Sequence, residues 1–115
     1  MELLRRLKLR CIWSWAGVVA TWTSEHSFRS WVWANLVSGV LALILPMSPA
    51  ERALILALGI LILAAELLNT AIEDAVDYIS TEDHPLAKRA KDAGSAGVAV
   101  AAIAAGVAWV VILIG

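Results

Sequence analysis

The sequence lacks two features of small secreted domains. It contains a single cysteine, Cys11, so no disulfide bond can form within the chain. Its basic start is not followed at once by an apolar core and a small-residue cleavage site, so we predict no signal peptide. The first membrane-spanning segment is instead expected to act as its own insertion signal. The net charge of −1 by itself points to no class of partner.

Apolar residues are what this sequence has in excess. They make up 61% of the 115 residues, whereas a soluble domain is nearer half apolar. A chain of this length could bury only a modest core in water, so lipid is the natural solvent for the remaining apolar side chains. Length and composition together predict one integral membrane domain over residues 1–115, without a separate soluble module.

Basic residues gather at the start of the chain. The first ten residues hold four basic side chains against one acid: Arg5, Arg6, Lys8 and Arg10 against Glu2. The mixture of basic and apolar positions over residues 1–24 is typical of an amphipathic helix that lies on an anionic membrane surface. Nucleic-acid binding is the alternative for a basic segment. This one is short and adjoins an apolar chain, so no nucleic-acid partner is predicted.

Three apolar segments follow the basic start. They predict transmembrane helices at about residues 28–46, 53–79 and 93–115, with a polar link over residues 80–92 before the third. The expected fold is therefore an all-α membrane protein with an N-terminal interfacial helix and three transmembrane helices. Basic residues lie at the N-terminus and in the polar link, so the positive-inside rule places both in the cytoplasm.

A stripe of polar residues interrupts the second apolar segment. Glu66, Asn69, Glu73 and Asp77 fall on one face of a helix, within an arc of roughly 80° at about 100° per residue. Glu66 lies about 20 Å from Arg52 along the helix, which puts it inside the bilayer, whereas Glu73 and Asp77 reach the headgroups. An ionisable group at such depth indicates a functional site. A polar seam between helices and a proton or ion pathway are the alternatives for the same stripe.

Two further groups of residues lie at the same water surface. Glu25 precedes the first transmembrane segment, and it could share Mg²⁺ with an acid of the stripe because Mg²⁺ prefers oxygen ligands. In the polar link, Lys91 and its basic neighbours could hold phosphates. Residues 92–95 could begin the third helix with free backbone N–H groups, which also suit a phosphate.

The two motifs together resemble the signature of the prokaryotic diacylglycerol kinases. AELLNTAIEDAVD contains the pattern E-x₂-N-x₃-E-x₃-D, and about a dozen residues later RAKDAGSAGV contains K-D-x-G-S-A. The spacing from Ser14 and Trp15 to Glu25 and Phe28 also fits, so the resemblance covers nearly the whole chain. The stretch HPLAK is shared with the undecaprenol kinases of the same superfamily, whereas Gly94 and the residues after it favour the diacylglycerol branch.

This resemblance implies a homotrimeric enzyme of the bacterial inner membrane that phosphorylates a lipid hydroxyl with ATP and Mg²⁺. Carried over by motif, Glu66 corresponds to the general base and Asn69 to its positioning partner. The implied Mg²⁺ ligands are Glu25 and Glu73. The implied nucleotide-site residues are Arg6, Ser14, Asp77, Lys91 and Asp92. Diacylglycerol is the expected acceptor; undecaprenol is the alternative within the superfamily, and a small proton-coupled transporter is the alternative from another class.

Overall fold

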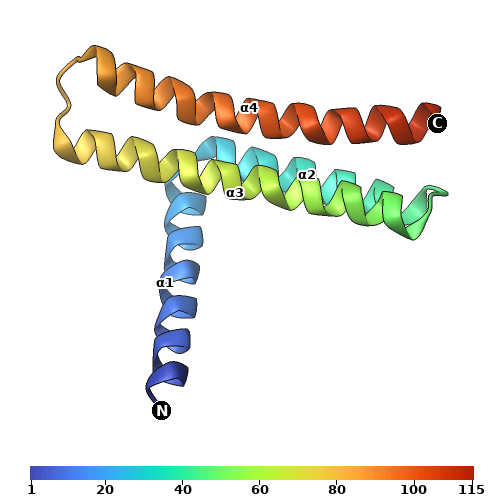
Figure 1. Cartoon of the computed structure of the whole chain (residues 1–115), viewed down its shortest axis with the longest axis horizontal. Helices are drawn as coiled ribbons and strands as arrows, with labels where there is room; N and C mark the ends of the chain where they lie inside the picture. The colour runs from blue at the N-terminus through green and yellow to red at the C-terminus, as the bar shows by residue number, and fades with distance from the viewer.

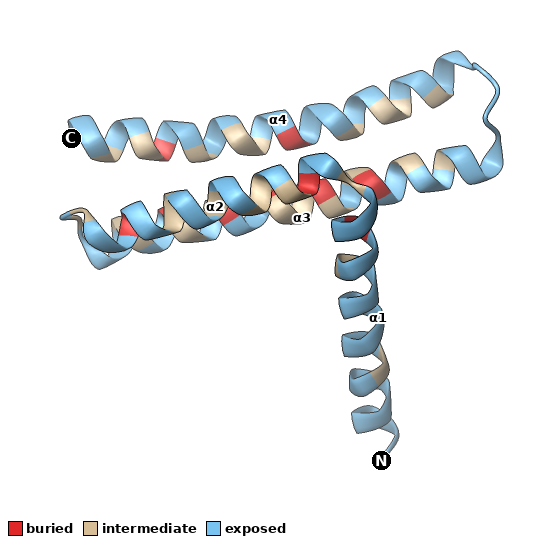
Figure 2. Ribbon diagram, turned by 180° about the vertical axis from the view of Figure 1, so that it is seen from behind, coloured by how far each residue is buried: buried red, intermediate tan, exposed pale blue.

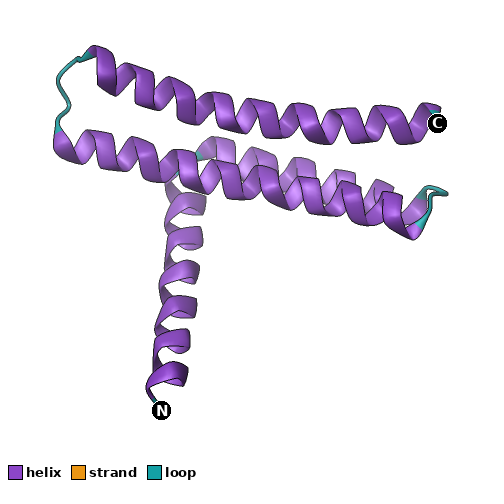
Figure 3. Cartoon of the chain, in the orientation of Figure 1, coloured by secondary structure: helices purple, strands orange, loops and turns teal.

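The computed structural model describes all 115 residues and contains four helices and no strand (Figure 3). The helices are α1 (Glu2–Ser24), α2 (His26–Ile44), α3 (Pro49–Ile79) and α4 (Pro85–Ile114). Each of α2, α3 and α4 is long and apolar enough to cross a membrane. The predicted all-α architecture, with one N-terminal helix and three candidate membrane spans, is confirmed.

Helix α3 organises the other three helices. It packs along α2 on one side and along α4 on the other, while α2 and α4 make no close backbone approach to each other. Helix α1 runs transverse to these three and is attached to them only at its C-terminal end (Figure 1). This arrangement suits a helix that lies along a membrane surface while the other three cross the membrane.

One residue makes the corner between α1 and α2. Glu25 ends α1 and begins α2 in an extended conformation, with φ −117° and ψ 110°. Arg29 of α2 stabilises this corner, since its Nη1 donates to the carbonyl oxygens of Trp22 at 2.6 Å and Thr23 at 3.3 Å. These are last-turn carbonyls of α1, which lack partners within their own helix. A residue of α2 therefore caps α1.

The start of α3 is four residues earlier than the apolar pattern predicted. Ser48 and Glu51 form a capping box: Ser48 Oγ accepts from the Glu51 N–H at 3.1 Å, and Glu51 Oε1 accepts from the Ser48 N–H at 2.8 Å. Pro49 occupies the first helical position, where its missing N–H costs nothing. Helix α2, in turn, ends at Ile44, because Leu45 precedes Pro46 and takes an extended conformation.

Helix α4 begins at Pro85, so much of the polar link is helical rather than a loop. The His84 side chain caps the helix by accepting from the Leu86 N–H at 3.1 Å, and Pro85 stands at the first helical position. The predicted helix start at residues 92–95 is therefore wrong. The N–H groups there lie inside α4 and are not free to bind a phosphate.

Very little of the chain is buried. Only 10 of the 115 residues are buried, and the largest apolar cluster consists of Ala42, Ile55 and Ala108 with their partly buried neighbours (Figure 2). Large apolar side chains are exposed along α2, α3 and α4. Exposed apolar area on this scale is covered by lipid or by other protein chains.

Candidate active site

Glu66 is the only buried acidic side chain, with 4% of its surface exposed. It lies on α3 where this helix meets the corner between α1 and α2. The Ser27 hydroxyl of α2 donates to Glu66 Oε2 at 3.3 Å. Two other carboxylates, Glu25 and Glu73, are close enough to act on it electrostatically. A buried carboxylate with two more beside it is a candidate for chemistry rather than for packing.

Asn69 lies one turn further along the polar face of α3. Its Nδ2 donates to Glu73 Oε1 at 3.1 Å, and its Oδ1 is buried without a hydrogen-bond partner. Gly94 of α4 approaches this oxygen so closely that a Cβ atom at position 94 would lie 2.5 Å from it. Such a separation is shorter than real Cβ contacts. The absence of a side chain at Gly94 therefore allows α4 to pack closely against Asn69 of α3.

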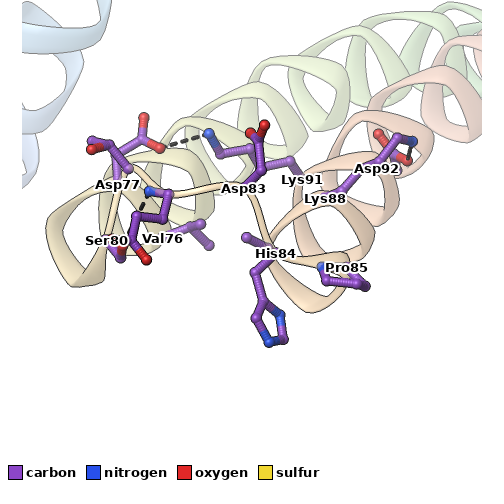
Figure 4. A pocket seen from close by; sticks show the side chains of 12 residues that line it. Val76, Asp77, Ser80, Asp83, His84, Pro85, Lys88, Lys91 and Asp92 are labelled. Carbon is purple, nitrogen blue, oxygen red and sulfur yellow. Dashed lines mark hydrogen bonds and ion pairs between the residues drawn. The ribbon is translucent and has the colours of Figure 1, made fainter.

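Lys91 and Asp77 connect α4 to α3 further toward the C-terminal end of α3 than Glu66. Lys91 Nζ donates to Asp77 Oδ1 at 2.6 Å (Figure 4). Asp92 pairs instead with Lys88, one turn before it on α4. Both pairs line a pocket of about 720 Å³ between the end of α3, the loop after it and the start of α4. Ligand pockets in proteins usually fall within about 300–1,000 Å³.

The oxygen ligands predicted for Mg²⁺ come from two elements. Glu25 lies at the corner between α1 and α2, Glu73 lies on α3, and both side chains are partly exposed. No group of three or more His, Cys, Asp or Glu side chains is arranged to hold a metal ion. Two carboxylates suit Mg²⁺ nonetheless, because it commonly takes one or two from the protein and the remaining oxygens from phosphates and water.

The two predicted site residues on α1 are apart from the others. Arg6 pairs with Glu2 at 2.9 Å near the free end of the helix, and Ser14 is exposed midway along it (Figure 1). Hydrogen bonds from Arg5 and Arg6 hold the pKa of the Glu2 carboxyl below its usual value. Within one chain the structure does not bring Arg6 and Ser14 to the pocket at the α3–α4 end.

Comparison with known sequences decides the family to which this chain belongs. The family model described as prokaryotic diacylglycerol kinase matches residues 12–113. The chain belongs to the prokaryotic diacylglycerol kinase family.

Several named relatives match most of the length of this chain. The chain is 45% identical to the diacylglycerol kinase of Pseudomonas aeruginosa, over 97% of this chain and 91% of that protein. It is 41% identical to the diacylglycerol kinase of Escherichia coli K12, over 88% of this chain and 83% of that protein. Identity to the diacylglycerol kinase of Helicobacter pylori is 40%, over 80% and 72% respectively.

Membership in the diacylglycerol kinase family makes this chain a kinase that acts on an alcohol in lipid metabolism. Three site features were missed by reasoning from the sequence. Ser27 was not singled out, because its partner Glu66 is 39 residues away and no local pattern connects them. Neither Lys88 nor His84 was assigned to the site by name, yet both line the pocket. The histidine could have been recognised as a helix cap, because Pro85 follows it directly.

Proposed function

We propose that this protein transfers the γ-phosphoryl group of ATP to the hydroxyl of diacylglycerol, which gives phosphatidic acid. The observation that carries the proposal is the position of Glu66: a buried carboxylate next to the corner of α1 and α2, in a chain of the diacylglycerol kinase family. A lipid hydroxyl lies at the bilayer surface, and ATP arrives from water. A base at shallow membrane depth can meet the first while groups closer to water bind the second.

In this mechanism Glu66 acts as the general base. It accepts the proton of the lipid hydroxyl as that oxygen attacks the γ-phosphorus and the bond to the β-phosphate oxygen breaks, which releases ADP. A carboxylate has about four acceptor sites on two oxygens, so the bond from Ser27 to Oε2 leaves Oε1 able to accept from the substrate. Asn69 orients the site through its bond to Glu73.

The remaining groups bind and orient the nucleotide. Glu25 and Glu73 would hold Mg²⁺, which neutralises phosphate charge when bound, since phosphoryl transfer depends mainly on positioning and electrostatic stabilisation. Lys91 would contact phosphate oxygens from the pocket at the α3–α4 end, with Asp77 and Asp92 arranging the cations there. The N-terminus and this pocket would face the cytoplasm of a bacterial inner membrane, where ATP is available.

A homotrimer would complete the site. Arg6 and Ser14 lie on a helix that projects away from its own pocket, so they can reach a nucleotide only at a neighbouring subunit. The exposed apolar faces of α2, α3 and α4 offer surfaces for such neighbours. Cross-linking in a mild detergent should give a closed trimer, and a fully active monomer would contradict this assembly.

The purified protein in mixed micelles tests the proposed reaction. Given ATP, Mg²⁺ and either diacylglycerol or undecaprenol, it should form phosphatidic acid from the first far faster than polyprenyl phosphate from the second. Preference for undecaprenol would reassign the acceptor. The absence of any phosphorylated lipid, together with proton-coupled solute uptake in proteoliposomes, would replace the kinase by a transporter.

A further inference from the structure

Two side chains of α2, Ser27 and Trp31, approach the proposed base as donors, and Ser27 is the one whose hydrogen bond to it has a defined geometry. It stands in the first turn of α2, and its hydroxyl donates to Glu66 Oε2 at 3.3 Å across the boundary between α2 and α3. We infer that Ser27 is a positioning residue, which holds one oxygen of Glu66 so that the other faces the lipid hydroxyl. This inference rests on the proposed function and assigns a group on the acceptor side of the same site.

The charges around Glu66 show why a donor is needed there. The carboxylates of Glu25 and Glu73 both lie near it, and like charges repel its anionic form. Glu66 is also nearly excluded from solvent, so water satisfies little of its hydrogen-bonding capacity. A glutamate has three rotatable side-chain bonds, and a fixed donor on another helix restricts them. The Ser27 hydroxyl therefore stabilises the Glu66 carboxylate against its charged neighbours and restricts the conformations of the Glu66 side chain.

The position of Ser27 at the corner between α1 and α2 also relates the base to the proposed metal ligand Glu25. Glu25, Ser27 and Arg29 alternate along the start of α2, and each has a different task. Arg29 caps α1 and so fixes the corner, Glu25 presents a carboxylate beside the site, and Ser27 holds the base. The corner thus links the position of Glu66 to that of Glu25. The distance between the reacting hydroxyl and the proposed metal-bound phosphate depends on that relation.

A matched pair of substitutions separates the effect of the hydroxyl donor from the effect of side-chain shape. Ser27→Thr keeps a hydroxyl, whereas Ser27→Val has nearly the same shape as threonine and no donor. We expect the valine variant to lower kcat about tenfold, as for the loss of one hydrogen bond to a charged group, with KM for ATP unchanged. The threonine variant should keep at least half of the wild-type kcat.

Two controls accompany this pair. Ser30→Ala removes a hydroxyl one turn further along α2 that bonds to His26 and not to Glu66, and it should leave kcat unchanged. In a Glu66→Gln background, Ser27→Val should lower the residual rate by less than twofold, because the oxygen that it orients no longer acts as a base.

Equal losses in the threonine and valine variants would overturn the inference, since shape alone would then explain them. So would an unchanged kcat in the valine variant, or a full tenfold loss in the Glu66→Gln background. In each of these cases the wild-type protein still phosphorylates diacylglycerol, so the proposed function stands. A wild-type protein that phosphorylates no lipid would instead overturn the proposed function, and the role of Ser27 with it.

Discussion

Replacing Gly94 by alanine tests how α4 keeps Asn69 in place. The new Cβ would lie 2.5 Å from Asn69 Oδ1 and 3.3 Å from Ile72 Cδ1, so something must move. Gly94 belongs to a 30-residue helix that cannot shift at one position alone, whereas the Asn69 amide is the end of a side chain. We therefore expect the amide to rotate and to lose its 3.1 Å bond to Glu73.

The size of the effect follows from that lost bond. A hydrogen bond to a charged group contributes about 1.5–3 kcal/mol, and overpacking that forces helices apart costs about 1–3 kcal/mol. If the amide rotates, the lost hydrogen bond weakens the arrangement of groups needed for catalysis, and the overpacking cost to folding is largely avoided. The Gly94→Ala variant should then fold nearly normally, with kcat for lipid phosphorylation reduced about 10- to 100-fold.

The same helix supplies the control. Gly97 lies one turn further along α4, and a Cβ atom there would have no other atom within 4 Å, so Gly97→Ala should leave kcat unchanged. Phosphatidic acid formation by both variants should be measured beside their thermal unfolding. In an Asn69→Ala background the clash with the amide is gone and only the 3.3 Å contact with the flexible end of Ile72 remains, so Gly94→Ala should lower kcat by less than twofold. Equal rates for the two glycine variants, or an undiminished effect without the Asn69 amide, would refute this reasoning.

Three further predictions concern the charged groups. Glu73→Gln should raise the Mg²⁺ concentration needed for half-maximal activity, whereas Glu66→Gln should lower kcat roughly 100-fold or more with the Mg²⁺ requirement unchanged; an Mg²⁺ titration of both variants checks this, and an equal shift in both would contradict the assigned roles. Lys91→Met should raise KM for ATP several-fold in steady-state assays, and it should do so more than Asp77→Asn, which leaves the cation in the pocket; the reverse order would remove Lys91 from the nucleotide site. Arg29→Gln should lower the free energy of unfolding by about 1–3 kcal/mol, measured by circular dichroism in detergent, because two last-turn carbonyls of α1 lose a charged donor; an unchanged midpoint would show that the cap contributes nothing.

Local pattern alone was sufficient for the helices and for the polar stripe. Three apolar segments predicted three membrane-length helices, and the spacing from Glu66 to Asp77 placed four polar groups on one helical face. The first feature depends on the length of the apolar segments and the second on the 3.6-residue period, and both are properties of a single element. The start of α4 was not predicted, although its signal is also local. The prediction used hydropathy alone and did not use the helix cap that His84 forms before Pro85.

Contacts between helices were decided only by the tertiary structure. The Ser27 hydroxyl meets Glu66, Gly94 meets Asn69, and Lys91 meets Asp77, and in each pair the partners lie on different helices. The transverse direction of α1 likewise depends on the cap that Arg29 provides from α2. These contacts are set by how two helices cross and by their relative register, to within about one turn. Hydropathy and periodicity describe one helix at a time. They therefore determined which face carries the chemistry, while packing determined which residues of other helices hold that face in position.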